Sequence, residues 1–238
     1  MVQYFSTVGE VRAVTLIVHG LNIRPDAMFD YLRIITESSS DVYLISLSRH
    51  SQSDVNNVKV NHSLWEAEML DGFDKSHKRA ASLGVPVYFL GYSLGALLGQ
   101  SMIASSFPYA CFEKQVLIAP AIALRSHCYL LKGLFVLGVE KRLPSYTPKK
   151  YRVHNYLPLS IYEVLFKEVD KLVQTRFHGL DIPTLIIIDP EDELISYKKI
   201  KAYQEQFRLN QWLLLPLNPS LKGRSIKYHH CLLDADSM

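Results

Sequence analysis

The serine of a Gly-Tyr-Ser-Leu-Gly pentapeptide at residues 91–95 has the clearest chemical potential in this chain. An apolar run at 85–90 precedes the pentapeptide and a helix-like segment follows it, so Ser93 falls on a strand-to-helix turn that can hold a nucleophile on a strained backbone. Glycine at positions 91 and 95 lets the strand and the helix approach each other. The pattern alone is weak because glycine and serine are common, but together with both flanking elements it predicts a nucleophilic serine.

Acyl transfer by a serine also requires a general base, a carboxylate that orients the base, and N–H donors for the developing oxyanion. Candidates for these donors follow the apolar run at 13–18, where His-Gly-Leu-Asn at 19–22 lets the backbone turn. We expect the backbone N–H groups of Leu21 and Leu94 to form the oxyanion hole. His19 could itself be a base, but a histidine at a strand end is expected to be buried and hydrogen-bonded in support of the loop.

The orienting carboxylate should come from Asp-Pro-Glu-Asp-Glu at 189–193, which follows an apolar run at 183–188. Four carboxylates leave the choice open at this point. Without Ser93 earlier in the chain, the segment would be interpreted as a solvated acidic turn. With the serine before it and histidines after it, the catalytic interpretation is favoured.

The base should lie in the loop after the apolar run at 212–216, which contains the adjacent residues His229 and His230. Adjacent side chains in an extended segment point to different sides of the backbone. Only one of these two histidines is therefore expected to reach Ser93.

Apolar runs rich in β-branched residues alternate with segments of helical period along most of the chain. This alternation predicts parallel strands joined by crossover helices. The expected strands lie at 13–18, 42–47, 85–90, 115–119, 183–188 and 212–216. The expected helices lie at 25–37, 61–83, 93–106 and 196–207. The predicted fold class is α/β, with a mostly parallel central sheet and helices on both faces.

The segment at 125–180 breaks the alternation, because it separates two expected strands by far more than an ordinary connection. Its last part, 160–174, has an apolar helical face and predicts a surface helix docked on another element. Its first part, 129–137, is apolar but too short to span a bilayer, and we expect it to roof an apolar pocket. We predict a core at 1–124 and 181–238 with a helical cap, or lid, inserted at 125–180.

Composition places the chain among globular proteins and favours a cytoplasmic one. Its 238 residues are 48% hydrophobic and 21% charged, which suits one large domain with a substantial core. A net charge of +3, without zinc-finger spacing or interleaved basic and aromatic residues, argues against nucleic acid as a partner. Three cysteines do not predict a disulfide framework, and the first residues do not predict a signal peptide.

The order of these motifs resembles the α/β-hydrolase fold family. His-Gly-Leu-Asn and Gly-Tyr-Ser-Leu-Gly come first, and an acid and then a histidine follow. Within that family the chain resembles small carboxylesterases and monoacylglycerol lipase-like or lysophospholipase-like serine hydrolases. The similarity covers nearly all of the chain from Val11 onward, and 125–180 matches the position of the family's cap between its sixth and seventh strands.

The resemblance also implies which acid and which base act. The family's spacing after the strand places the acid at Asp192, with Asp189 as a minority candidate. In the family, tyrosine or glycine precedes the histidine and an aspartate follows a few residues later, which favours His229 over His230 because Tyr228 precedes it.

The implied function is hydrolysis of carboxylic esters, including acyl or lipid esters, through an acyl-enzyme formed on Ser93. A thioesterase or an amidase would use the same residues, and a non-catalytic hydrolase-fold protein that binds a ligand or partner is the alternative from another class. No cofactor is implied. A metal-dependent hydrolase is disfavoured because the other histidines show no ligand spacing: His50, His62, His77, His127, His154 and His178.

Basic residues are concentrated in the first half of the predicted cap. Such a charge run is most often a solvated face. The sharper hypothesis is that it brings the cap onto an anionic membrane or binds an acidic head group. The residues are Arg125, Lys132, Lys141, Arg142, Lys149, Lys150 and Arg152, against only Glu140.

Overall fold

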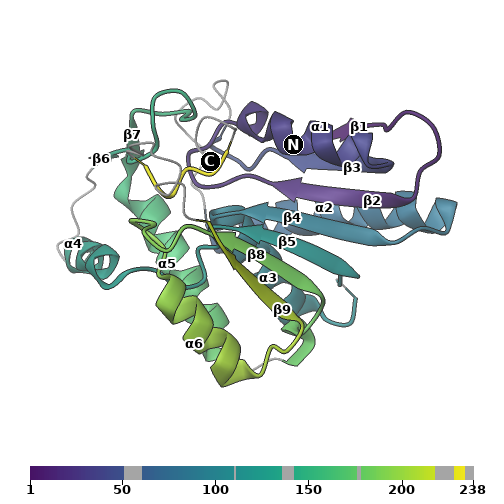
Figure 1. The fold of residues 1–238 in the computed structure, drawn as a ribbon. Coiled ribbons are helices and arrows are strands. Elements are labelled where there is room, and N and C mark those ends of the chain that lie inside the picture. Colours follow the sequence, from purple (N-terminus) through teal and green to yellow (C-terminus); the bar gives the residue numbers. More distant parts are fainter. Residues whose placement is uncertain (51–60, 110, 136–141, 176–177, 218–227, 234–238) are drawn as a thin grey trace.

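A seven-stranded sheet with the order β1-β3-β2-β4-β5-β8-β9 forms the centre of the molecule (Figure 1). The computed structural model describes residues 1–50, 61–109, 111–135, 142–175, 178–217 and 228–233. Strand β1 pairs with β3 in antiparallel register, and the other pairs are parallel. The strands are β1 (Val2–Phe5), β2 (Ala13–Val18), β3 (Ser40–Ile45), β4 (Val87–Tyr92), β5 (Lys114–Ile118), β8 (Thr184–Ile188) and β9 (Trp212–Pro216).

Helices cover both faces of this sheet. The chain moves from β2 to β3 in one direction across the sheet and from β3 to β4 to β5 in the other. Right-handed crossovers therefore place α1 on one face and α2, α3 and α6 on the opposite face (Figure 1). The helices are α1 (Phe29–Glu37), which follows the 3₁₀ turn η1 (Pro25–Met28), α2 (His62–Leu83), α3 (Leu94–Ser106) and α6 (Tyr197–Phe207).

Each face of the sheet has its own apolar core. The larger core packs β2, β4 and β5 against α2, α3 and α6, with buried Trp65, Phe89, Leu97 and Tyr203. The smaller core lies under α1 and includes Met28. Side chains alternate between the faces of a strand, so neighbouring residues of β2 contribute to different cores. This double burial explains why the strands are continuous apolar runs.

The segment at 125–180 contains both helices and a small sheet. Its elements are the 3₁₀ turn η2 (Ser126–Leu131), α4 (Lys132–Phe135), β6 (Arg142–Pro144), β7 (Tyr156–Pro158), α5 (Leu159–Gln174) and the 3₁₀ turn η3 (His178–Leu180). The two-stranded antiparallel sheet β6-β7 was not expected from the sequence. Helix α5 packs on α3, and its buried apolar face belongs to the larger core. The division into a core and a cap stays a prediction.

The predicted alternation of strands and helices is confirmed along the core. All six predicted strands exist, with shifts of one or two residues at their ends, and the predicted helices match η1 with α1, α2, α3, α5 and α6. Strand β1 was missed because its four residues carry no long apolar run. Within the described ranges no helix is both long and apolar enough to cross a bilayer.

Candidate functional site

Ser93 occupies the sharp turn between β4 and α3, as its flanking glycines predict. Its backbone is in a strained conformation, with φ 49° and ψ −110°. A Cβ on Gly91 would lie 2.6 Å from Cα of Ala96, and one on Gly95 would lie 2.3 Å from the carbonyl oxygen of Val18. Only glycine therefore lets strand and helix approach closely enough to present this serine at the carboxyl edge of the sheet.

His230 joins Ser93 to a buried carboxylate. Its Nε2 lies 3.0 Å from Oγ of Ser93, and its Nδ1 lies 2.7 Å from Oδ2 of Asp192. Asp192 is fully buried, and its other oxygen accepts hydrogen bonds from the amides of Leu194 and Ile195, both at 2.8 Å. Because an ionised carboxylate accepts only, Asp192 assigns the proton of the neutral ring to Nδ1 and leaves Nε2 facing the serine as an acceptor.

The preference for His229 as the residue that reaches the serine is wrong in this geometry. The ring of His229 turns the other way, and its Nδ1 lies 2.8 Å from Oδ2 of Asp189. That hydrogen bond is the main cause of a raised pKa of His229, which burial opposes and the nearby carboxylate charges support. The tyrosine before His229 suggested the wrong member of the pair, because the orientation depends on contacts distant in sequence.

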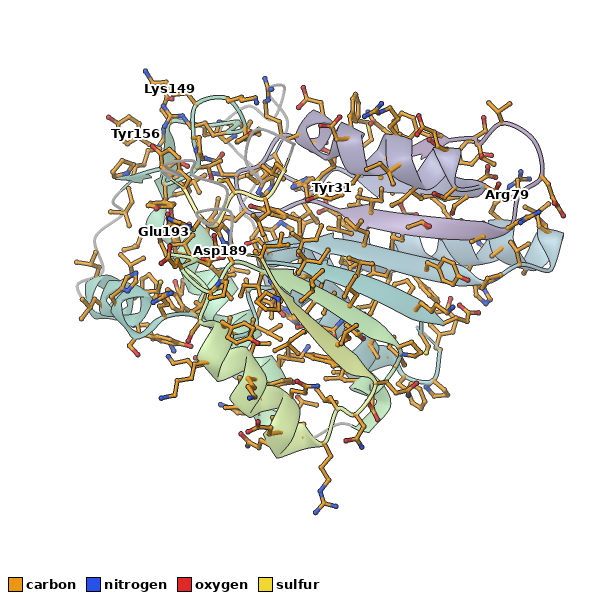
Figure 2. The ribbon with its side chains drawn as sticks, viewed as in Figure 1. Tyr31, Arg79, Lys149, Tyr156, Asp189 and Glu193 are labelled. Atoms are coloured by element: carbon orange, nitrogen blue, oxygen red, sulfur yellow. The ribbon has the colours of Figure 1, made fainter. Side chains whose placement is uncertain are left out.

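Those contacts hold the backbone of the segment at 228–233, here called the histidine loop. Glu193 accepts the amide of His229 through Oε1 and the amide of His230 through Oε2, each at 2.9 Å. The hydroxyl of Tyr92 donates to the carbonyl oxygen of His230 at 2.7 Å. Sequence reasoning missed this function of Glu193, since the acidic segment showed four carboxylates with no sign of how they divide their roles. Figure 2 shows Asp189 and Glu193 close together near the carboxyl end of β8.

The two amides expected to form an oxyanion hole lie beside the serine. Leu21 and Leu94 both line the cavity at Ser93, and Leu94 is the first residue of α3, where helical N–H groups have no partner within the helix. Within the described ranges, neither amide donates a backbone hydrogen bond. The assignment of both amides as oxyanion donors stays a prediction.

His19 supports the loop that carries Leu21, as expected. It is fully buried, its Nδ1 donates to the carbonyl oxygen of Gly20 at 2.9 Å, and its Nε2 accepts the amide of Leu47 at 3.1 Å. Burial, with a smaller contribution from His50, lowers the pKa of His19 to about 3. The ring is neutral at ordinary pH, and both of its nitrogens are occupied by backbone groups.

An apolar cavity of about 110 Å³ opens at Ser93. Most of its lining comes from aliphatic and aromatic side chains, and Ser93 and His230 are also among the lining residues. The segment at 125–180 supplies Cys128, Leu131, Ser145, Tyr146, Thr147, Leu157, Tyr162, Leu165 and Phe166. Leu131 belongs to the stretch at 129–137 that was expected to roof a pocket; residues 136 and 137 of that stretch lie outside the described residues.

One cluster of potential metal ligands exists among the described residues, formed by Asp189, Glu191 and His229. Asp189 and His229 are already paired with each other. The third member, Glu191, is largely exposed, and its Oε2 lies 3.7 Å from Nε2 of His229. The cluster forms a hydrogen-bonded pair with an exposed carboxylate beside it, on the far side of the loop from Ser93.

Solved structures with similar folds include lipases and esterases. The chain is 18% identical to one of the metagenome-derived lipolytic enzymes LipS and LipT, with a TM-score of 0.74 over 99% of this chain and 91% of that one. It is 14% identical to a monoglyceride lipase from Saccharomyces cerevisiae, with a TM-score of 0.73 over 90% and 82% of the chains. A monoacylglycerol lipase from Paleococcus ferrophilus gives 15% identity and a TM-score of 0.71 over 92% and 88%.

Neither a protein-family model nor a curated protein sequence matches the chain. The structural similarity shows that the chain has the α/β-hydrolase fold that its motifs resemble.

Proposed function

We propose that this protein is a serine hydrolase that cleaves carboxylic esters through an acyl-enzyme. The observation that carries the proposal is the continuous hydrogen-bonded series from Ser93 through His230 to Asp192. The Ser93 end of this series lines an apolar cavity. This arrangement has the nucleophile, base and orienting acid that acyl transfer needs. The base of the proposal is His230, in place of the His229 preferred from sequence.

The mechanism follows from the positions of the atoms. As Oγ of Ser93 attacks the ester carbonyl, Nε2 of His230 takes the hydroxyl proton, and Asp192 stabilises the resulting imidazolium. The amides of Leu21 and Leu94 donate to the oxyanion of the tetrahedral intermediate. Its collapse breaks the bond to the leaving alcohol, which takes the proton from His230. Water then attacks the acyl-enzyme with the same imidazole as base, and the carboxylic acid leaves with Ser93 restored.

The lining of the cavity supports an acyl chain as the part of the substrate that it holds. Aliphatic and aromatic side chains surround the space next to the serine, and burying methylene groups there is favourable by about 0.8 kcal/mol each. The lipase and esterase neighbours support acyl or lipid esters in the same way. A thioester or an amide would meet the same catalytic atoms.

Contact of the cap with an anionic membrane is a second part of the proposal. Arg142 is the first residue of β6, and Lys149 and Arg152 lie in the connection to β7, whose first residue, Tyr156, is exposed. Figure 2 shows Lys149 and Tyr156 at the periphery of the molecule, in the same left part of the view as Glu193. Sedimentation with vesicles of phosphatidylglycerol should exceed that with phosphatidylcholine and fall with salt; equal binding to both vesicles would remove this part.

The last part of the proposal is that the protein works in a reducing compartment, such as the cytoplasm. No disulfide joins the described cysteines Cys111, Cys128 and Cys231, which supports it.

Hydrolysis of chromogenic esters from acetate to palmitate tests the main proposal. The wild-type protein should turn over part of the series, and Ser93→Ala should lose roughly 10³-fold or more in kcat. The preferred acyl length then measures the usable depth of the cavity. A folded wild-type protein without activity on esters, thioesters or amides would favour a non-catalytic binding protein.

A further inference from the structure

One carboxylate and one aromatic contact hold the histidine loop, and the aromatic contact comes from the segment at 125–180. Glu193 accepts both loop amides, of His229 and His230, through its two oxygens. The ring of Tyr146, which lines the cavity, packs edge-on against the ring of Tyr228, the residue before His229, with the ring centroids 5.7 Å apart. Burial, and after it the charge of Glu193, raise the pKa of Tyr146. The position of the histidine loop is therefore tied to a residue between β6 and β7.

The loop that carries Leu21, one of the two expected oxyanion donors, is tied to the residue before Tyr146. Asn22, which is fully buried, donates through Nδ2 to Oγ of Ser145 at 2.7 Å and to the carbonyl oxygen of His154 at 2.8 Å. Its Oδ1 accepts the amide of His154 at 2.9 Å, and its own carbonyl oxygen accepts the amide of Val153 at 3.2 Å. All the side-chain polar atoms of Asn22 thus bind the connection between β6 and β7.

Ser145 and Tyr146 are consecutive residues, so one peptide unit joins the two sides of the site. The side chain of Ser145 accepts a hydrogen bond from Asn22, which follows Leu21, and the ring of Tyr146 contacts Tyr228, which precedes the two histidines. Both residues also line the cavity at Ser93. This short connection therefore contacts both the loop that carries Leu21 and the loop that carries His230.

We propose that the connection between β6 and β7 is a brace, and that Glu193 and Asn22 act with it as positioning residues, Glu193 for the base and Asn22 for the oxyanion donor Leu21. This inference rests on the proposed function and deepens it. A displacement of about 1 Å at a catalytic group can cost 10²-fold in rate, so a brace of this kind matters for turnover even though its residues do not touch the reacting atoms.

Glu193→Gln is the most direct variant. Glutamine keeps the shape of the side chain, but only one of its two polar atoms can accept, so one loop amide then faces an NH₂ donor. Glu191→Gln is the matched control, because it removes the same charge two residues away from a carboxylate that is 64% exposed. We expect Glu193→Gln to lower kcat by about tenfold or more with little change in KM, and the control to behave like wild type.

Tyr146→Phe is the second variant, and it should fold because it removes only the phenolic oxygen. It removes the phenol on which the charge of Glu193 acts, while both loop amides keep their acceptor. The brace predicts a lower kcat, smaller in effect than that of Glu193→Gln, at an unchanged melting temperature. Wild-type kcat in both variants would overturn the proposal.

A proton spectrum separates failure of the brace from failure of the proposed function. The Nδ1–H of His230, bonded to Asp192, should give a low-field resonance that disappears in His230→Ala. The brace predicts that this resonance broadens or is lost in Glu193→Gln and is retained in Glu191→Gln, whether or not the protein hydrolyses esters. Retention in both variants would refute the positioning role of Glu193, whereas inactivity of wild type with the expected spectra would refute only the hydrolase assignment.

Discussion

Two aspartate–histidine pairs lie side by side in this protein and differ in what they face. Nδ1 of His229 lies 2.8 Å from Asp189, and Nδ1 of His230 lies 2.7 Å from Asp192. Both aspartates are fully buried. The remaining nitrogen of His229 faces the exposed Glu191, whereas that of His230 faces Ser93.

An aspartate beside a histidine therefore does not identify a catalytic base. The direction of the second ring nitrogen does, and it is set by backbone contacts. Glu193 fixes both amides of the loop, and Tyr92 fixes the carbonyl oxygen of His230. With the backbone held in this way, the two adjacent rings lie on opposite sides, and only one reaches the serine.

The largest expected difference between the pairs comes from deleting each imidazole. His230→Ala should lower kcat/KM for an ester by about 10³-fold or more, because Ser93 loses its proton acceptor. His229→Ala should lower it by less than about tenfold, since its ring does not contact the serine. Steady-state kinetics on one chromogenic ester measure both. Similar losses in the two variants would mean that the pairs act as one unit.

Substitution of the two aspartates should also lower kcat more for the pair that faces Ser93, but by a smaller factor than deletion of the imidazoles. Asp192→Asn can donate to Nδ1 and so favours the wrong tautomer of His230, which should cost about 10² to 10⁴ in kcat. Asp189→Asn alters only the pair of Asp189 and His229, here called the outer pair, and should keep most of the activity. Both substitutions are isosteric, so kcat at matched melting temperatures is the readout. A greater loss in Asp189→Asn would reverse the assignment of the acid.

The outer pair should affect stability in a pH-dependent manner. The folded protein raises the pKa of His229, mainly through Asp189. The stabilisation is therefore fully present below the unfolded-state pKa of about 6.5 and is lost as pH rises through the higher folded-state pKa. His229→Gln should thus lower the melting temperature more at pH 5.5 than at pH 9. An equal loss at both values would show that the charge of the ring contributes nothing.

The smallest expected effect belongs to Glu191, the exposed carboxylate beside the outer pair. Glu191 is 64% exposed and lies 3.7 Å from Nε2 of His229, so its ion pair should be worth about 0–1 kcal/mol. Glu191→Gln should therefore change the melting temperature by no more than a few degrees at pH 5.5, and added salt should remove the difference. A large loss that resists salt would assign Glu191 a greater share in the outer pair than Asp189.

The sequence predicts the core of the fold because the signals there are local. Apolar runs and helical periods identified β2, β4 and β9, and the glycines around Ser93 identified its turn. Short strands such as β6, with three residues, carry too few side chains for a period to be recognised.

The candidate site is predictable only as far as residue types and order allow. Ser93 and Asp192 lie where the motifs place them, in contact with a histidine of the expected loop. The choice between His229 and His230 depends on Glu193, which lies 36 and 37 residues away in sequence. Because that contact exists only in the folded chain, no local pattern in the histidine loop could have shown which ring faces the serine.

Covalent labelling of Ser93 by a fluorophosphonate tests the central claim most directly, because it requires the activated serine but no knowledge of the substrate. Intact-mass spectrometry over time, with peptide mapping of the adduct, would compare wild type, His229→Ala and His230→Ala. We expect labelling of Ser93 at similar rates in wild type and His229→Ala, and labelling about 10²-fold slower or more in His230→Ala. Rapid labelling of His230→Ala together with loss of labelling in His229→Ala would contradict the account.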